Sequence, residues 1–241
     1  MHEPEKCEEK DRPEVLQVPG VEFEVDTMVT RVYLVHPRTG RIIGRVAVTL
    51  VVDRFSRLII GCAMTVDVSR HTAVALALLN AATEKVGYGR ELGLHVATGE
   101  WPSGRPDIVR LAPNSFDNDA QWAPIAGLGI AIQLGSPMPK RKSLVESAFQ
   151  RWDDEVLKSL PGYGCGEHGH SESEGGPATA VRTLLPLRRF TVDWIIRYNT
   201  SHVLNRYPLT RHMVQDGVQP IPIKLWNWGV HNVGPVVIPD C

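Results

Sequence analysis

Two acidic side chains, Asp26 and Glu146, stand where carboxylates could hold divalent cations for phosphoryl transfer on nucleic acid. That chemistry uses two Mg²⁺ ions about 3.5–4 Å apart, which clamp the attacking and the leaving oxygen. Hard cations prefer carboxylate oxygens, and three carboxylates usually share the two ions. Asp26 closes an alternating apolar and acidic run, and Glu146 lies one turn into an amphipathic segment. The first and third carboxylates of such a metal site are therefore present.

The segment before Asp26 predicts a half-buried strand, because apolar and acidic residues alternate in it. Two further segments rich in β-branched residues follow after short turns. Three consecutive strands joined by tight turns favour an antiparallel meander. The expected strands span residues 21–35, 42–52 and 57–66.

Helices and shorter strands alternate in the rest of the chain. Ser69 offers an N-cap to the first helix, and the segment that carries Glu146 has an apolar stripe at i, i+3 and i+4 spacing. The order predicts an α/β fold with a mixed five-stranded sheet flanked by helices, which is also the RNase H-like order. The expected elements are a helix at about 70–86, a strand at 108–111, a weak helix at 118–127, a strand at 129–134, and helices at 141–160 and 188–205.

Changes in composition divide the chain into five parts. The charged, proline-containing N-terminal segment is expected to be mobile, and a Gly- and Ser-rich run indicates a flexible insertion. Two prolines and a Trp-Asn-Trp run near the end predict the start of a β-module. The parts are a lead-in (1–20), an RNase H-like core (21–160), the flexible insertion (161–178), the closing helix of the core (179–205) and the start of a small C-terminal β-module (206–241).

The second carboxylate of the metal site is missing. An RNase H-like sheet supplies its three carboxylates from the first strand, from the end of the fourth strand and from a helix that faces both. At the end of the fourth strand this chain has Ala112, 34 residues before Glu146. Asp107 begins that strand and lies about 16 Å away, at about 3.3 Å per residue. Asp117 and Asp119 lie beyond the following loop and could bend back, although nothing local fixes them there.

A series of motifs resembles the integrase catalytic core of DDE transposases, in particular those of the TnsB type. The resemblance extends over about residues 20–230 and implies an RNase H-like fold. The motifs, in order, are FEVDT (23–27), VYLV (32–35), IIGR (42–45), VDRFSRLIIG (52–61), WP (101–102), RPDI (105–108), KSLVESAF (142–149) and PIPIKLWNWG (220–229).

This resemblance implies a protein that cuts and joins DNA with Mg²⁺ or Mn²⁺, using Asp26 and Glu146 as catalytic residues and metal ligands. It also implies transposon ends and target DNA as partners, together with other transposition proteins, and an oligomer on DNA. Ala112 stands where the family has an Asp, so we expect weakened metal binding and impaired catalysis. Two alternatives stay open: a non-catalytic DNA-binding or assembly protein, and a nuclease that recruits Asp117 or Asp119.

Other polar clusters have a structural and a functional interpretation. The Lys140-Arg141-Lys142 run is either an ordinary charged helix start or a set of DNA phosphate contacts. Asp53 is expected to anchor a turn, and the alternative is a role at the candidate metal site. Cys165, His168 and His170 lack a clear fourth ligand for zinc. We expect the tryptophans at 152, 194, 226 and 228 to serve in packing.

The composition excludes several classes of protein. A net charge of -1 argues against a dedicated nucleic-acid coat protein, and a hydrophobic content of 43% argues against wholesale disorder. Four scattered cysteines favour reduced thiols, and the charged N-terminus does not resemble a signal peptide. With no uncharged run long enough for a bilayer, we expect a cytoplasmic protein without membrane contact.

Overall fold

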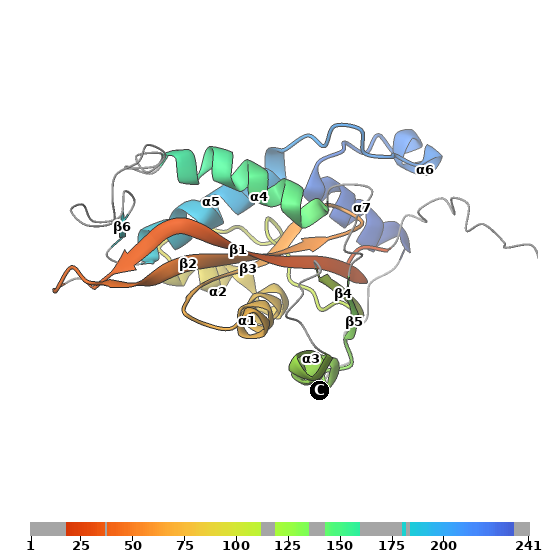
Figure 1. Ribbon diagram of the computed structural model, residues 1–241. Coiled ribbons are helices and arrows are strands. Elements are labelled where there is room, and N and C mark those ends of the chain that lie inside the picture. Colours follow the sequence, from red (N-terminus) through yellow and green to blue (C-terminus); the bar gives the residue numbers. More distant parts are fainter. Residues whose placement is uncertain are drawn as a thin grey trace, which may run out of the picture.

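The computed structural model describes residues 18–36, 38–111, 119–134, 143–159, 180–181 and 184–233. These residues form an α/β fold with one twisted sheet and helices on both faces (Figure 1). Several predictions lie outside the described residues. They concern Ala112, Asp117, the 140–142 run, the insertion at 161–178 and nearly all of the lead-in.

The sheet has the mixed five-stranded arrangement predicted from the sequence. Its strand order is β3-β2-β1-β4-β5. The first three strands are antiparallel neighbours, whereas β4 is parallel to β1 and β5 is parallel to β4, so the RNase H-like fold is confirmed. A two-residue strand, β6, also pairs with the far end of β1. The strands are β1 (Glu22–Val35), β2 (Ile42–Asp53), β3 (Ile59–Val66), β4 (Ile108–Leu111), β5 (Ala131–Leu134) and β6 (Ala180–Val181).

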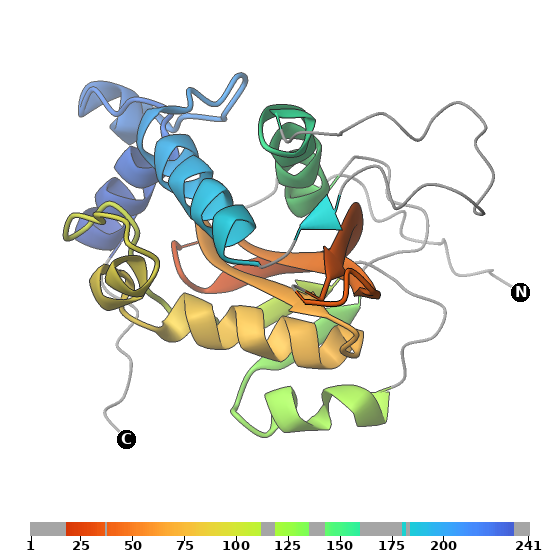
Figure 2. The ribbon, with the colours of Figure 1, turned by 90° about the vertical axis from the view of Figure 1, so that its left-hand side faces the viewer.

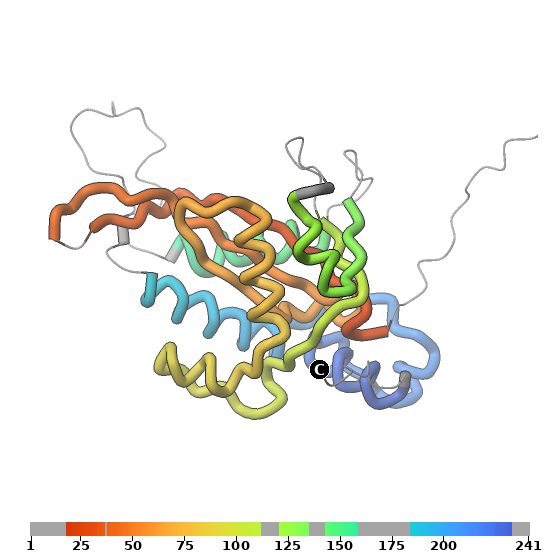
Figure 3. Tube along the Cα trace, turned by 90° about the horizontal axis from the view of Figure 1, so that it is seen from below, coloured from red at the N-terminus to blue at the C-terminus, as the bar shows by residue number. Residues whose placement is uncertain are grey.

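The helices cover both faces of this sheet. In Figure 2, α4 and α5 lie above the strands and α1 lies below them. Figure 3, seen from below, shows α1 crossing the sheet, with α3 to one side of it. The helices are α1 (Arg70–Ala82), α2 (Lys85–Glu91), α3 (Asp119–Ala126), α4 (Leu144–Glu155), α5 (Leu185–Ser201), α6 (Arg211–Gln215) and α7 (Pro222–Val233), and a short 3₁₀ turn, η1 (Leu157–Ser159), follows α4.

The single helix predicted at 70–86 is two helices. Thr83 is extended and ends α1, and the Lys85 ammonium donates hydrogen bonds to the carbonyl oxygens of Asn80 and Thr83 at 2.6 and 2.7 Å. Glu84 then caps α2, because its carboxylate accepts hydrogen bonds from the first backbone N–H groups of that helix. Side chains at the junction therefore satisfy helix ends that the periodicity alone does not reveal.

The predicted start of a C-terminal β-module is wrong, because residues 211–215 and 222–233 are helical. Thr210 caps α6 through its hydroxyl, and Pro222 opens α7, a position where a missing N–H costs nothing. In α7, Ile223 and Trp226 are buried against the core at helical spacing. This burial outweighs the strand-like alternation of the Trp-Asn-Trp run.

Two apolar cores lie on opposite faces of the sheet. The first packs β2 and β3 against α4 and α5 and contains the fully buried Trp152 and Trp194. The second packs Phe23 and Val25 against α1, α3 and α7. The prediction that Trp152, Trp194 and Trp226 serve in packing is confirmed.

In the described part of the chain, no helix is both long and apolar enough to cross a bilayer.

Candidate active site

Asp26 lies in β1 at the point where its neighbour β4 ends. On one side Asp26 pairs with Leu50 of β2. On the other side the parallel register ends at Val25, which lies beside Leu111. Leu111 directly precedes Ala112 in the chain, as Val25 precedes Asp26, and Leu111 is the last described residue of β4.

The Asp26 carboxylate has two hydrogen-bond donors within the described structure. Its Oδ1 atom accepts one bond from the Thr27 backbone N–H at 2.8 Å and another from Arg70 Nη2 at 3.2 Å. Arg70 is the first residue of α1, and its guanidinium also lies over the Trp122 ring, 5.9 Å from the ring centroid. The Arg70 and Asp26 side chains are only 17% and 28% exposed, respectively. A fixed cation therefore already contacts the first candidate metal ligand.

Glu146 lies in the first turn of α4, off the apolar stripe, as predicted. Its backbone N–H donates to the Ser143 hydroxyl at 3.1 Å, so Ser143 is the N-cap. The buried residues of the helix face the core, whereas Glu146 is exposed. It lines a groove of about 660 Å³ together with Asp153 and residues 28–31 of β1.

The start of α4 is tied directly to β1. Glu24 Oε2 accepts a hydrogen bond from the Leu144 backbone N–H at 2.7 Å. Since Leu144 opens α4, the contact fixes the helix that carries Glu146 on the strand that carries Asp26. The two candidate ligands are thus on adjoining elements, although the groove at Glu146 is not lined by Asp26.

These residues do not fit a complete two-ion centre. The described residues contain no group of three acidic, His or Cys side chains that could hold a metal ion. Asp26 is paired with Arg70. Asp119 is the first residue of α3, but its side chain is not among those that the structure describes. Asp26 and Glu146 are the described residues that would hold a cation, and the third carboxylate of the pattern is not among them.

The other acids of β1 have structural roles. Glu22 is buried and forms ion pairs with Arg110 and, at 3.4 Å, with Arg54. Glu24 also pairs with Arg54, at 3.3 Å. The alternating acids therefore connect β1 to its neighbours, which leaves Asp26 as the acid of this strand beside the end of β4.

Asp53 anchors the turn between β2 and β3, as predicted. Its carboxylate accepts hydrogen bonds from the Gly20 N–H at 2.9 Å, the Ser56 N–H at 2.7 Å and the Ser56 hydroxyl at 2.6 Å. Burial raises the pKa of Asp53 to about 6, although these hydrogen bonds act in the opposite direction. All three contacts are made within the turn and the segment before β1, and none involves Asp26.

Arg70 is the residue of this site that the sequence does not reveal. It stands 44 residues after Asp26, directly behind a helix N-cap. A basic residue at that position is ordinary, and only the packing of α1 and α3 brings it to β1. The one local signal is Ser69, which predicts the helix start but not the direction of the Arg70 side chain.

The fold and the site define an integrase-type core: a three-stranded meander, two further parallel strands, and acids on the first strand and on the helix tied to it. Residues 24–162 match the model of the TnsB C-terminal domain family, and the chain belongs to this family. The transposon Tn7 transposition protein TnsB of Escherichia coli is 26% identical over 225 residues, which cover 90% of this chain. The chain spans 31% of the length of that relative.

Three solved viral structures are similar to this chain. A chain of the simian T-cell lymphotropic virus intasome in complex with a PP2A regulatory subunit has a TM-score of 0.45 and 14% identity, and the match covers 81% of this chain and 54% of that one. The HTLV-2 integrase catalytic core in complex with magnesium has a TM-score of 0.43 and 12% identity, covering 78% and 92%. The BIV integrase catalytic core has a TM-score of 0.42 and 12% identity, covering 89% and 98%.

Proposed function

We propose that this chain is the catalytic core of a TnsB-like transposase, a protein that cleaves DNA and transfers the cut strands. We further propose that its catalysis is impaired because Ala112 replaces the second acid. The supporting observation is the position of Asp26 on β1 and of Glu146 on α4, both inside the segment that matches the family. The proposed partners are transposon ends, target DNA and other transposition proteins, with an oligomer on DNA. The proposed location is the cytoplasm.

The surroundings of Asp26 support the proposed impairment. A phosphoryl-transfer site depends on charges that are positioned before the reaction begins. Here a guanidinium contacts one carboxylate oxygen of Asp26, and the described residues supply no third acid. Mg²⁺ or Mn²⁺, when bound, would stabilise charge on the phosphoryl group. Because the described residues do not fit a pair of ions, we assign no catalytic step to the metal.

The test restores the missing acid. Wild type, Ala112→Asp and the double variant Ala112→Asp/Asp26→Asn are compared for nicking of plasmid DNA and for joining of pre-processed ends, in Mg²⁺ and in Mn²⁺. We expect background activity from wild type, a gain of about 100-fold or more in Ala112→Asp, and background again in the double variant. The gain that needs both acids would identify Ala112 as the lost position.

The opposite result would be activity in wild type that Ala112→Asp does not raise and that Asp26→Asn abolishes. The second acid would then come from elsewhere in the chain, with Asp117 and Asp119 as the residues to substitute first. No activity in any variant would contradict the proposal that one lost carboxylate accounts for the impairment.

The second candidate is a non-catalytic protein that keeps the core for contacts with DNA or with other transposition proteins. The observation that favours it is the ion pair between Asp26 and Arg70, which gives the carboxylate a partner other than a metal. DNA binding in EDTA that weakens steeply with salt supports this function. No DNA binding at low salt excludes its DNA-binding form.

A further inference from the structure

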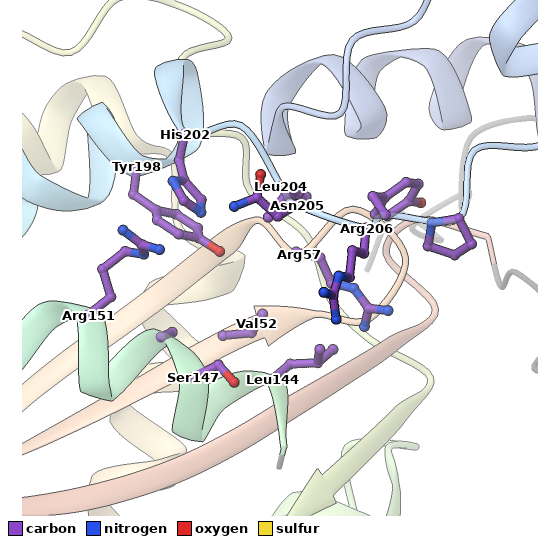
Figure 4. A pocket seen from close by; sticks show the side chains of 13 residues that line it. Val52, Arg57, Leu144, Ser147, Arg151, Tyr198, His202, Leu204, Asn205 and Arg206 are labelled. Carbon is purple, nitrogen blue, oxygen red and sulfur yellow. The ribbon is translucent and has the colours of Figure 1, made fainter. Parts of the chain in front are cut away.

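A cavity of about 360 Å³ lies beside the start of α4, on the other side of this helix from the groove at Glu146. Three segments that are distant in sequence line it: the end of β2 with the β2–β3 turn, α4, and the end of α5 with the residues that follow it up to 208 (Figure 4). Its polar lining includes Arg57, Arg151, Arg206, Tyr198, His202 and Ser147.

The cavity is positively charged. Three of its lining residues are arginines and none is acidic. Arg151 forms an exposed ion pair with Glu155 at 3.0 Å, whereas neither Arg57 nor Arg206 has an ion-pair partner among the described carboxylates. The buried Asp53 carboxylate attracts Arg57 without forming such a pair. In Figure 4, Arg57 and Arg206 enter the cavity from one side and Arg151 lies on the other.

The backbone is strained at both of these arginines. Arg57 has a φ of 65° and Arg206 a φ of 62°. Among the non-glycine residues of the described chain, only Asp67 also has a positive φ. A bulky residue in this region costs on the order of 1 kcal/mol or more, and such strain gathers at functional sites. The two strained residues line the same cavity.

The aromatic wall of the cavity supplies neutral donors. Tyr198 and His202 are stacked with ring centroids 4.9 Å apart, and Trp194 stacks on the other side of Tyr198 at 5.5 Å. Burial raises the pKa of Tyr198 to about 12, so its hydroxyl keeps its proton at neutral pH. Burial and the nearby Arg151 charge lower the pKa of His202, which leaves the imidazole neutral at pH 7.

We propose that this cavity binds a phosphate group of the DNA backbone, held by Arg57 and Arg206 with Arg151 and the Tyr198 hydroxyl as further donors; this rests on the proposed function. A planar guanidinium fits phosphate oxygens through paired hydrogen bonds, and no lining carboxylate competes for the arginines. The cavity also contacts Leu144 and Ser147, which flank Glu146 in the first turns of α4. A strand bound there would lie on the face of α4 opposite the groove at Glu146.

The test removes the two guanidinium groups without disturbing the turns. The variant is Arg57→Asn/Arg206→Asn, because Asn tolerates positive φ better than other non-glycine residues. Its matched control is Arg41→Asn/Arg90→Asn, which removes two exposed arginines that do not line the cavity. Binding of a fluorescent DNA duplex is measured in EDTA at salt concentrations from about 50 to about 200 mM, where phosphate contacts dominate the salt dependence of binding.

We expect the cavity variant to bind about tenfold more weakly and to lose about one unit of the slope of log K against log salt, since one phosphate contact contributes about 0.9. The control should change the dissociation constant by less than about threefold. Arg151→Gln, which alters no strained backbone, should weaken binding in the same direction. Thermal melting confirms that each variant is folded.

Equal loss in the cavity variant and the control overturns the proposal, and so does no loss in either. In both cases DNA binding by wild type would still support the proposed function. If wild type binds no DNA at low salt, both the cavity proposal and the proposed function are contradicted. Inorganic phosphate tests whether the cavity binds a free anion instead of DNA. If phosphate raises the melting temperature of wild type but not of the cavity variant, and the two proteins bind DNA equally well, the assignment to DNA is overturned.

Discussion

Arg70 governs the electrostatics of the candidate active site at the scale of single residues. Its guanidinium donates to Asp26 Oδ1 from the first turn of α1, and the Trp122 ring supports it from below the sheet. A cation that approaches Asp26 must share this carboxylate with a fixed positive charge. The pair thus lowers the attraction of Asp26 for metal ions.

Arg70→Gln should therefore raise the affinity of Ala112→Asp protein for Mn²⁺. Repulsion between charges a few ångströms apart near a protein surface is of the order of 1–4 kcal/mol. We therefore expect Arg70→Gln to lower the dissociation constant for Mn²⁺ roughly tenfold. Isothermal titration calorimetry measures it. Arg45→Gln, which removes a cation bonded to the Thr30 carbonyl, is the control. Unchanged affinity in Arg70→Gln would show that the pair does not compete with metal.

The raised pKa of the buried Asp53 carboxyl makes the stability of the protein depend on pH. Burial raises its pKa from 3.8 to about 6, so the folded protein binds this proton more tightly than the unfolded chain. The contribution of Asp53 is therefore favourable below pH 4 and is lost as the pH rises through 6. The free energy of unfolding of wild type relative to Asp53→Asn should fall over this window, by at most roughly 3 kcal/mol. Urea titrations at several pH values measure the difference, and a constant difference would contradict the assignment.

Asn199 connects two elements across the first core, at the scale of helices and strands. Its side chain is buried and pairs with both backbone groups of Ile59, accepting from the N–H and donating to the carbonyl oxygen, each at 2.9 Å. This contact joins α5 to the start of β3, next to the turn that carries Arg57. The position of one wall of the cavity thus depends on it.

Asn199→Asp should lower the free energy of unfolding by about 3 kcal/mol, because a carboxylate cannot donate to the Ile59 carbonyl and is itself buried. The matched control is Asn232→Asp, at an exposed position in α7 where the amide donates to the Trp228 carbonyl. The control should change stability by no more than about 0.5 kcal/mol. Denaturant unfolding compares them, and equal effects of the two substitutions would refute a special role for Asn199.

The sequence predicts elements well where one periodic pattern dominates. The three-stranded meander and α4 follow from alternation and from an apolar stripe, and both are present. It fails where the deciding contact is local capping or distant burial. Lys85 and Glu84 divide one predicted helix into two, and Trp226 is buried at helical spacing in a segment expected to be a strand.

For the whole molecule, the candidate ligands are predictable and their surroundings are not. Asp26 and Glu146 lie on the elements expected from motif order, whereas Arg70 reaches Asp26 only through packing of the lower helices. The arginine cavity likewise joins the β2–β3 turn to the residues after α5. No short-range pattern links segments so far apart, and two ordinary arginines gain meaning only from their shared cavity.

The central claim is that this transposase-type core keeps two carboxylates and lacks a third at Ala112. The most direct test is a crystal structure of wild type and of Ala112→Asp, each soaked in Mn²⁺ and read by anomalous scattering. We predict at most one weakly occupied ion between Asp26 and Glu146 in wild type, and two ions about 4 Å apart in Ala112→Asp. Two well-occupied ions in wild type, with Asp117 or Asp119 as the third ligand, would contradict the claim.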